Sequence, residues 1–160
     1  MRNLGFACLG LVLTACFGCK SLPTGVYKEG LVADNGEPAY ITVQHCLIAF
    51  EGTGTSATRS KDEAQALALD LFEKAKQGDD FEKMVVQYTD DSPPGIYRMA
   101  NHGHEGDMSN RIPSRNVFRR DGMVPAFGDT GFPLKVGEFG LAPFDPDNSP
   151  FGWHIVKRIK

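Results

Sequence analysis

The chain has 160 residues, of which 41% are hydrophobic and 23% are charged, and these values are ordinary for a globular protein. The length suggests one domain with accessory segments. The formal net charge is −3 and no basic run or basic–aromatic patch stands out, which argues against a nucleic-acid-binding function.

The first residues have the pattern of a secretory signal. The basic start Met1-Arg2-Asn3 precedes an apolar run over residues 4–15. This run is shorter than the roughly 20 residues that a helix needs to cross a bilayer. The pattern therefore predicts a signal peptide over residues 1–15, which is removed on maturation.

The apolar run ends in the letters L-T-A-C at residues 13–16, which resemble the cleavage box of bacterial lipoproteins. The resemblance implies that Cys16 accepts the lipid and anchors the protein to a membrane, with Cys19 as a weaker candidate. An ordinary signal peptide with chance cysteines is the alternative. Phe17 stands where an aspartate commonly signals inner-membrane retention. We therefore expect a lipid-anchored protein of the cell envelope, at the outer membrane if the cell has one.

The segment before the globular domain has no hydrophobic period. Residues 20–38 mix Gly, Pro, Lys and Glu, so residues 16–38 are predicted to be a lipidated tether or linker. Cys19 lies in this tether, and we therefore expect no structural disulfide between it and Cys46.

A strand is predicted over residues 39–50, which are rich in β-branched side chains. Alternation places Ile41, Val43, His45 and Leu47 on one face and Cys46 on the other. His45 is therefore expected to point into the fold or into a cleft. Cys46 is expected to be a small buried apolar residue.

Two helices are predicted next. The letters S-K-D-E at residues 60–63 form a capping box, with Ser60 as the N-cap, and apolar residues then recur at helical spacing until Gly78. Asp79-Asp80 begins a second, short helix. Both helices are expected to pack on the sheet as scaffold.

The second half of the chain predicts shorter elements. Short strands are expected over residues 95–99, 139–144 and 151–159, and a short helix with turns over residues 123–132. Residues 100–121 are polar and long for a structureless loop, which indicates a functional loop or an insertion. Their run His102-Gly103-His104-Glu105 could ligate a metal, but no further ligand follows at a suitable spacing, so a solvated loop is favoured and no metal is expected.

Short motifs follow one another along the chain: Gln44-His45, residues 60–64, residues 87–91, residues 123–127, Gly131-Phe132, Val136-Gly137-Glu138 and residues 149–155. With these motifs in this order, the chain from Ile41 onward resembles the parvulin-type peptidyl-prolyl cis-trans isomerases. The resemblance implies an α+β domain over residues 39–160, with a four-stranded antiparallel sheet surrounded by helices in the order βαααβαββ.

The resemblance also implies a catalytic centre. His45 and His154 match the paired histidines of the family, Asp91 stands where the family has Cys or Asp, and Ser149 stands where a Thr or Ser hydroxyl usually joins the histidines. Asp91 would either accept a hydrogen bond from a histidine or face the substrate carbonyl. The alternative is that both histidines only brace the sheet from within.

Three apolar residues match the family's proline pocket. Met123 and Phe127 correspond to residues that hold the substrate proline, and Phe132 to an aromatic residue of the same pocket or its backing. Plain core packing is the alternative for all three. Two departures stand out: the basic cluster of phospho-specific members is missing before Arg59, and residues 100–121 look like an inserted loop.

The implied function is isomerisation of X–Pro bonds in exported polypeptides as they fold at the cell envelope. The expected partners are proline-containing unfolded or exported chains, with no cofactor, and the protein is expected to be a monomer. One alternative is a non-catalytic chaperone or binding module on a parvulin fold. The other is a structural envelope lipoprotein that docks a partner.

Overall fold

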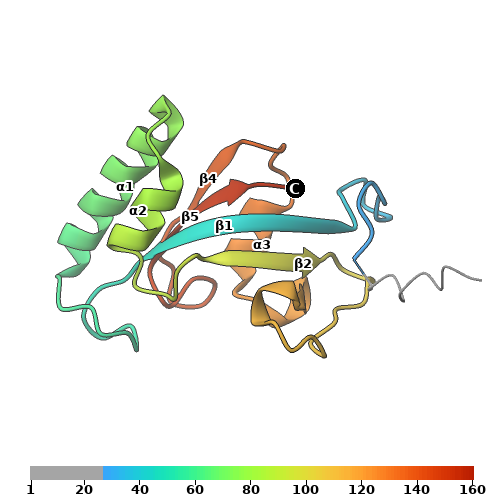
Figure 1. Ribbon diagram of the computed structural model, residues 1–160. Coiled ribbons are helices and arrows are strands. Elements are labelled where there is room, and N and C mark those ends of the chain that lie inside the picture. The colour runs from blue at the N-terminus through green and yellow to red at the C-terminus, as the bar shows by residue number, and fades with distance from the viewer. Residues whose placement is uncertain (1–26) are drawn as a thin grey trace, which may run out of the picture.

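A computed structural model describes residues 27–160, so the expected signal peptide and the cysteines Cys16 and Cys19 lie outside the described residues. Five strands form one sheet in the order β3-β2-β1-β5-β4 (Figure 1). The strands are β1 (Tyr40–Ile48), β2 (Ile96–Ala100), β3 (Val117–Arg119), β4 (Phe139–Ala142) and β5 (Trp153–Arg158). The central strand β1 pairs antiparallel with β2 and β5, β4 pairs antiparallel with β5, and β3 runs parallel to β2.

Three α-helices and two 3-10 turns complete the described part of the chain. They are α1 (Lys61–Gln77), α2 (Phe81–Tyr88), η1 (Pro113–Arg115), η2 (Arg120–Gly122) and α3 (Pro125–Gly131). The capping box of α1 is confirmed: Ser60 Oγ accepts from the Glu63 amide at 3.3 Å, and Glu63 Oε2 accepts from the Ser60 amide at 2.8 Å. None of the helices within residues 27–160 is both long and apolar enough to cross a membrane.

The alternation of β1 divides the core between the two faces of the sheet. Cys46 and Ile48 join Ile155 and the apolar sides of α1 and α2 on one face. Ile41 and Val43 pack with α3 on the other face. Cys46 is a buried free thiol, and burial raises its pKa to about 12. The face that carries Ile41 continues along β1 to His45 and Leu47, where Phe127 of α3 lies beside His45 and a site can open.

The expected fold, a four-stranded antiparallel sheet with three helices between its first two strands, is wrong in one strand and one helix. Residues 117–119, within the expected insertion, add β3 in parallel to the free edge of β2, where Val117 is buried against Ala100. Two helices rather than three lie between β1 and β2, because the sequence after α2 contains Pro93 and Pro94 and a proline has no amide hydrogen for a helix.

The start of the described chain packs on the domain rather than trailing from it. Residues 27–38 form part of the expected tether, and Val32 bridges to Pro38. The hydroxyls of Tyr27 and Thr42 lie 3.1 Å apart, within hydrogen-bond distance. An ion pair also holds this segment in place, because Glu37 Oε2 accepts from Arg120 Nη1 at 2.7 Å.

Arg120 ties this segment to α3. Its guanidinium donates to Glu37, to Asn101 Oδ1 at 2.9 Å and to Asp129 Oδ1 at 2.7 Å, and it lies 4.7 Å from the centroid of the Phe132 ring. Its side chain is only 10% exposed. The network therefore joins the segment before β1, the end of β2 and the helix that carries one wall of the site.

We expect Arg120→Met to lower the free energy of unfolding by about 3 kcal/mol, because it leaves the partly buried Glu37 carboxylate without its counter-ion. Urea unfolding would measure the change. Arg119→Met is a matched control, since Arg119 is 63% exposed and, among residues 27–160, forms an ion pair only with Asp121. Its expected effect is within about 0.5 kcal/mol. Equal losses in the two variants would contradict a structural role for the Arg120 network.

Candidate functional site

Two histidines from neighbouring strands meet on one face of the sheet. His45 lies on β1 and His154 on β5, where His154 stands opposite Leu47 in the strand register. Each histidine is 4% exposed, and their Nδ1 atoms lie 3.3 Å apart. The chain just before β2 passes close to His45 at Gly95. A glycine is required there, because its φ is +65° and an added Cβ would stand 2.3 Å from the His45 carbonyl oxygen.

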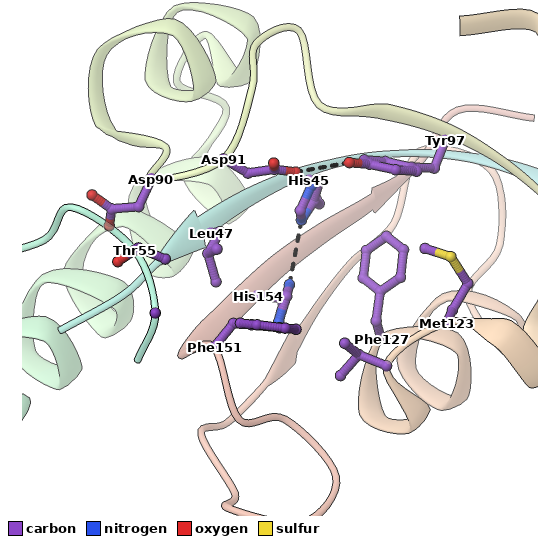
Figure 2. Close-up of a pocket in the computed structure, with 12 residues that line it drawn as sticks. His45, Leu47, Thr55, Asp90, Asp91, Tyr97, Met123, Phe127, Phe151 and His154 are labelled. Carbon is purple, nitrogen blue, oxygen red and sulfur yellow. Dashed lines mark hydrogen bonds and ion pairs between the residues drawn. The ribbon is translucent and has the colours of Figure 1, made fainter. Parts of the chain in front are cut away.

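Asp91 completes a polar chain with His45. Its Oδ2 atom lies 3.0 Å from His45 Nε2 and accepts from the Tyr97 hydroxyl at 2.8 Å (Figure 2). The hydrogen bond from His45 holds the pKa of Asp91 well below its usual range. Burial, and then the bond to Asp91, raises the pKa of Tyr97. Asp91 is therefore an ionised acceptor that faces the histidine.

The charge of Asp91 fixes the direction of the hydrogen bonds. A carboxylate only accepts, so His45 Nε2 carries a proton and donates to Asp91. In the tautomer that carries only this proton, His45 Nδ1 is an acceptor, and His154 donates to it from its own Nδ1. Burial, and then the nearby His45, lowers the pKa of His154 to about 3, so this ring is neutral at pH 7. Its Nε2 atom is left as a buried acceptor without a partner among residues 27–160.

A pocket of about 340 Å³ opens beside this chain of side chains, a volume in the range of small-ligand sites. Figure 2 shows Phe127 and Met123 facing the histidines across it. The Phe127 ring lies edge-on to His45, with centroids 4.9 Å apart, and 5.6 Å from His154. The lining residues are His45, Leu47, Gly54, Thr55, Asp90, Asp91, Tyr97, Met123, Val124, Phe127, Phe151 and His154.

Helix α3 positions the apolar wall. Pro125 opens the helix at its first position, where the missing amide hydrogen costs nothing, and Phe127 then points inward and is 2% exposed. Met123 and Val124 stand just before the helix and are half-buried. An apolar wall thus faces a polar one across the pocket, an arrangement suited to a ring next to an amide group.

Five of the seven sequence-predicted site residues line this pocket, and two do not. The five are His45, Asp91, Met123, Phe127 and His154. Ser149 is fully buried and its hydroxyl donates to the Gly152 carbonyl at 2.9 Å, not to a histidine. Phe132 is fully buried in the core behind Phe127.

Sequence reasoning missed several lining residues, among them Tyr97. It hydrogen-bonds Asp91, and its ring lies 5.1 Å from that of His45 and 5.9 Å from that of Phe127. Alternation along β2 places Tyr97 on the same face of the sheet as Met99, and this alternation is the sequence signal that could have identified it. Leu47 could have been found in the same way, because it shares the face of His45.

The loop after β1 offers no free cation to the pocket. Arg59, its first basic residue, donates to the Ala49 carbonyl at 2.8 Å and forms an ion pair with Asp90. The pocket lining itself contains two aspartates and neither lysine nor arginine. A dianionic phosphate on the substrate would therefore meet negative charge here, as the sequence already indicated.

The histidines of residues 100–121 lie outside the pocket. His102 pairs with Asp121, and the His104 ring packs edge-on against Tyr40 at 5.6 Å. In the part of the chain that the structure describes, no group of three or more His, Cys, Asp or Glu side chains is placed to hold a metal ion.

We expect Tyr97→Phe to raise the pKa of Asp91, because the carboxylate loses one of its donors. The bond to a charged acceptor also predicts a loss of about 1.5–3 kcal/mol in the free energy of unfolding. Carbon-13 NMR titration of the Asp91 carboxyl and urea unfolding would measure the two effects. An unchanged Asp91 titration would show that the hydroxyl does not stabilise the carboxylate.

Comparisons with known proteins agree with this geometry. The model of a family described as the PPIC-type PPIASE domain matches residues 29–159. Chaperone SurA of Chromohalobacter salexigens is 30% identical over 115 residues, which are 72% of this chain and 21% of SurA, so the chain spans about a fifth of that relative. The solution structure of TbPIN1 superposes with a TM-score of 0.55 at 17% identity, covering 76% of this chain and 98% of TbPIN1. Peptidyl-prolyl isomerase ESS1 of Candida albicans gives a TM-score of 0.51 at 19% identity, covering 81% and 66%.

Proposed function

The chain belongs to the PPIC-type peptidyl-prolyl isomerase family, and from this membership we propose that it catalyses cis–trans isomerisation of X–Pro bonds in exported polypeptides. The observation that carries the proposal is the pocket itself, in which Met123 and Phe127 face the Asp91–His45–His154 chain. The apolar wall suits a pyrrolidine ring, and the polar wall suits the amide beside it.

The chemistry requires no covalent intermediate. Rotation about an amide bond crosses a barrier of about 18–20 kcal/mol, and an X–Pro bond takes tens to hundreds of seconds without a catalyst. A catalyst that binds the twisted amide better than either planar isomer lowers this barrier. The twisted amide has lost its resonance and with it much of its charge separation, so a water-poor pocket favours it. Phe127 and Met123 supply that environment around the ring.

The polar chain keeps the opposite wall in one arrangement. His45 and Tyr97 both donate to Asp91, so its negative charge is directed to them and compensated by them. The substrate carbonyl would then meet a wall whose dipoles are already oriented, which costs little reorganisation in the transition state. In this proposal the histidines hold the wall and do not act as nucleophiles.

The cellular setting is proposed from the sequence motif alone. The box at residues 13–16 supports a lipid anchor on Cys16, and thus a place on the extracytoplasmic side of a membrane, at the outer membrane if there is one. The relative named Chaperone SurA supports unfolded, proline-containing polypeptides as partners, although this chain covers only 21% of it. We propose a monomer without a cofactor.

An isomerisation assay on the purified protein tests the activity. A proline peptide is enriched in the cis isomer, and its return to equilibrium is followed by NMR exchange or a protease-free fluorescence readout. The proposal expects the relaxation rate to rise in proportion to protein concentration. A rate that stays at the uncatalysed value over a wide range of protein concentration would reject it.

A second candidate is a chaperone that holds unfolded chains without useful turnover. The inserted loop supports it, because Met108 is 58% exposed and Ile112 is 46% exposed. Suppression of aggregation of an unfolded client that survives both Met123→Ala and Phe127→Ala would favour this candidate. Suppression that disappears in both variants would favour binding through the proline pocket.

A further inference from the structure

The inserted segment builds a second cavity next to the proline pocket. It has a volume of about 360 Å³, and we call it the insertion cavity. Its lining residues are Ser92, Pro94, Gly95, Ile96, Tyr97, Pro113, Ser114 and Phe118. Three of them, Pro113, Ser114 and Phe118, come from residues 100–121, the segment that the proline pocket does not use.

Tyr97 is the wall that the two cavities share, since it lines both. Its hydroxyl is held by Asp91, and its ring stands between two others, with centroids 5.1 Å from His45 and 5.4 Å from Phe118. Phe118 is fixed in turn by β3, where it stands opposite Met99 in the parallel pairing with β2. The cavity is therefore built on paired strands as well as on a loop.

The chemistry of the lining selects the kind of group that fits. None of the eight lining residues is charged, and apolar carbon from Pro94, Ile96, Pro113 and Phe118 surrounds the space, with two serine hydroxyls at Ser92 and Ser114. A charged group would lose its hydration there without gaining a counter-ion. An aliphatic or aromatic side chain would lose none.

We propose that the insertion cavity binds an uncharged apolar side chain of the same polypeptide whose proline occupies the neighbouring pocket. This inference rests on the proposed function and extends it from a proline site to a longer recognition element. His45 and Phe118, one beside each cavity, have ring centroids no farther apart than the His45–Tyr97 and Tyr97–Phe118 separations combined, and an extended chain advances about 3.3 Å per residue. A side chain up to about three residues from the proline is therefore the one that reaches the insertion cavity.

A substrate chain is the occupant that the geometry favours. A polypeptide bound through an internal proline must leave the pocket in both directions, and the shared wall makes the insertion cavity the next concave surface in one of them. The cavity gives binding that is equal for the ground state and the transition state, because it lies away from the rotating bond. Its occupation is expected to lower KM and leave kcat unchanged.

The test uses two peptide lengths and the full-length protein. A short peptide contains only the X–Pro unit, and extended peptides carry leucine or aspartate three residues before or three residues after the proline. We expect leucine on one of the two sides to lower both KM and Kd about tenfold relative to the short peptide, a change equivalent to about 1.4 kcal/mol for a partly buried side chain. Aspartate at the same place is expected to give no gain.

Two variants of the cavity and one control make the test specific. Phe118→Ala removes a wall and Ser114→Trp fills the space from an exposed position; both are expected to abolish the gain from leucine while the short peptide behaves as with the unaltered protein. Met108→Ala, in the same segment but outside the cavity, is expected to retain the gain.

The outcomes separate this inference from the proposed function. Equal Kd values for short and extended peptides, or a gain that survives both Phe118→Ala and Ser114→Trp, overturn the insertion cavity as a subsite. Absence of turnover with every peptide rejects the isomerase proposal alone, because the ratio of Kd values still reports on the cavity. An equal gain from leucine and aspartate would indicate contact with the peptide backbone only and would also overturn the inference.

Discussion

Replacing Phe127 by alanine is expected to lower kcat/KM for an X–Pro peptide by about 10- to 100-fold. The Phe127 ring lines the pocket and packs against His45 and His154. Contact with an apolar side chain of this size is worth about 1.5–3 kcal/mol, and each 1.4 kcal/mol corresponds to a factor of ten. The measurement is the isomerisation rate at several peptide concentrations, at a temperature where the variant stays folded.

A matched control is needed because the same change also weakens the core. Phe127 and Phe132 are both buried in one hydrophobic cluster, so each alanine variant is expected to lose about 3–5 kcal/mol in the free energy of unfolding. Only Phe127 lines the pocket, so Phe132→Ala is expected to keep most of its kcat/KM. If both variants lost activity equally, the loss would come from the packing of α3, and Phe127 would have no direct role at the substrate.

The parts of the fold that depend on neighbours in sequence were predictable. Alternation along β1 put His45 on the same face as Ile41 and Val43, because successive strand residues point to opposite sides. The capping box at Ser60 fixed the start of α1 for an equally local reason. Both signals need only a few adjacent residues to be read.

Elements that depend on distant partners were not predictable. Strand β3 has three residues, and its order comes from pairing with the free edge of β2 and from the burial of Val117. Its three residues are too few to show a strand period of their own. The tertiary neighbour therefore decides its structure, as is common for short strands.

The candidate site also combines features that the sequence predicted with features that it did not. The resemblance identified His45, His154 and Asp91 as a group, and the structure brings them together. It did not show that Ser149 would turn to the Gly152 carbonyl, since the direction of a buried hydroxyl depends on the nearest free acceptor in its loop. The orientation of Asp91 likewise became clear only with Tyr97 in place.

We expect the protein to lose about 2.5 kcal/mol of its free energy of unfolding between pH 7 and pH 4.5 because of His154. Burial lowers the pKa of this group from 6.5 to about 3. Between these two values the unfolded chain binds a proton that the folded protein does not bind. Stability therefore falls as the pH is lowered through this window, by about 1.4 kcal/mol per pH unit once below pH 6.5. Asp91, whose pKa is held low by His45, adds its own loss only below about pH 4.

Urea unfolding at pH 7 and pH 4.5 measures this dependence, and two variants assign it. His154→Gln removes the titrating ring and is expected to be less stable at pH 7 but to show a much smaller change between the two pH values. His104→Gln alters a half-buried histidine within residues 100–121 and is expected to keep the full change. A pH dependence that persists in His154→Gln would mean that the His154 ring accepts a proton in the folded protein as easily as in the unfolded chain. The ring that ends the Asp91–His45–His154 chain would then become charged in the folded protein as the pH is lowered, and its buried Nε2 atom would carry a proton that has no acceptor among residues 27–160.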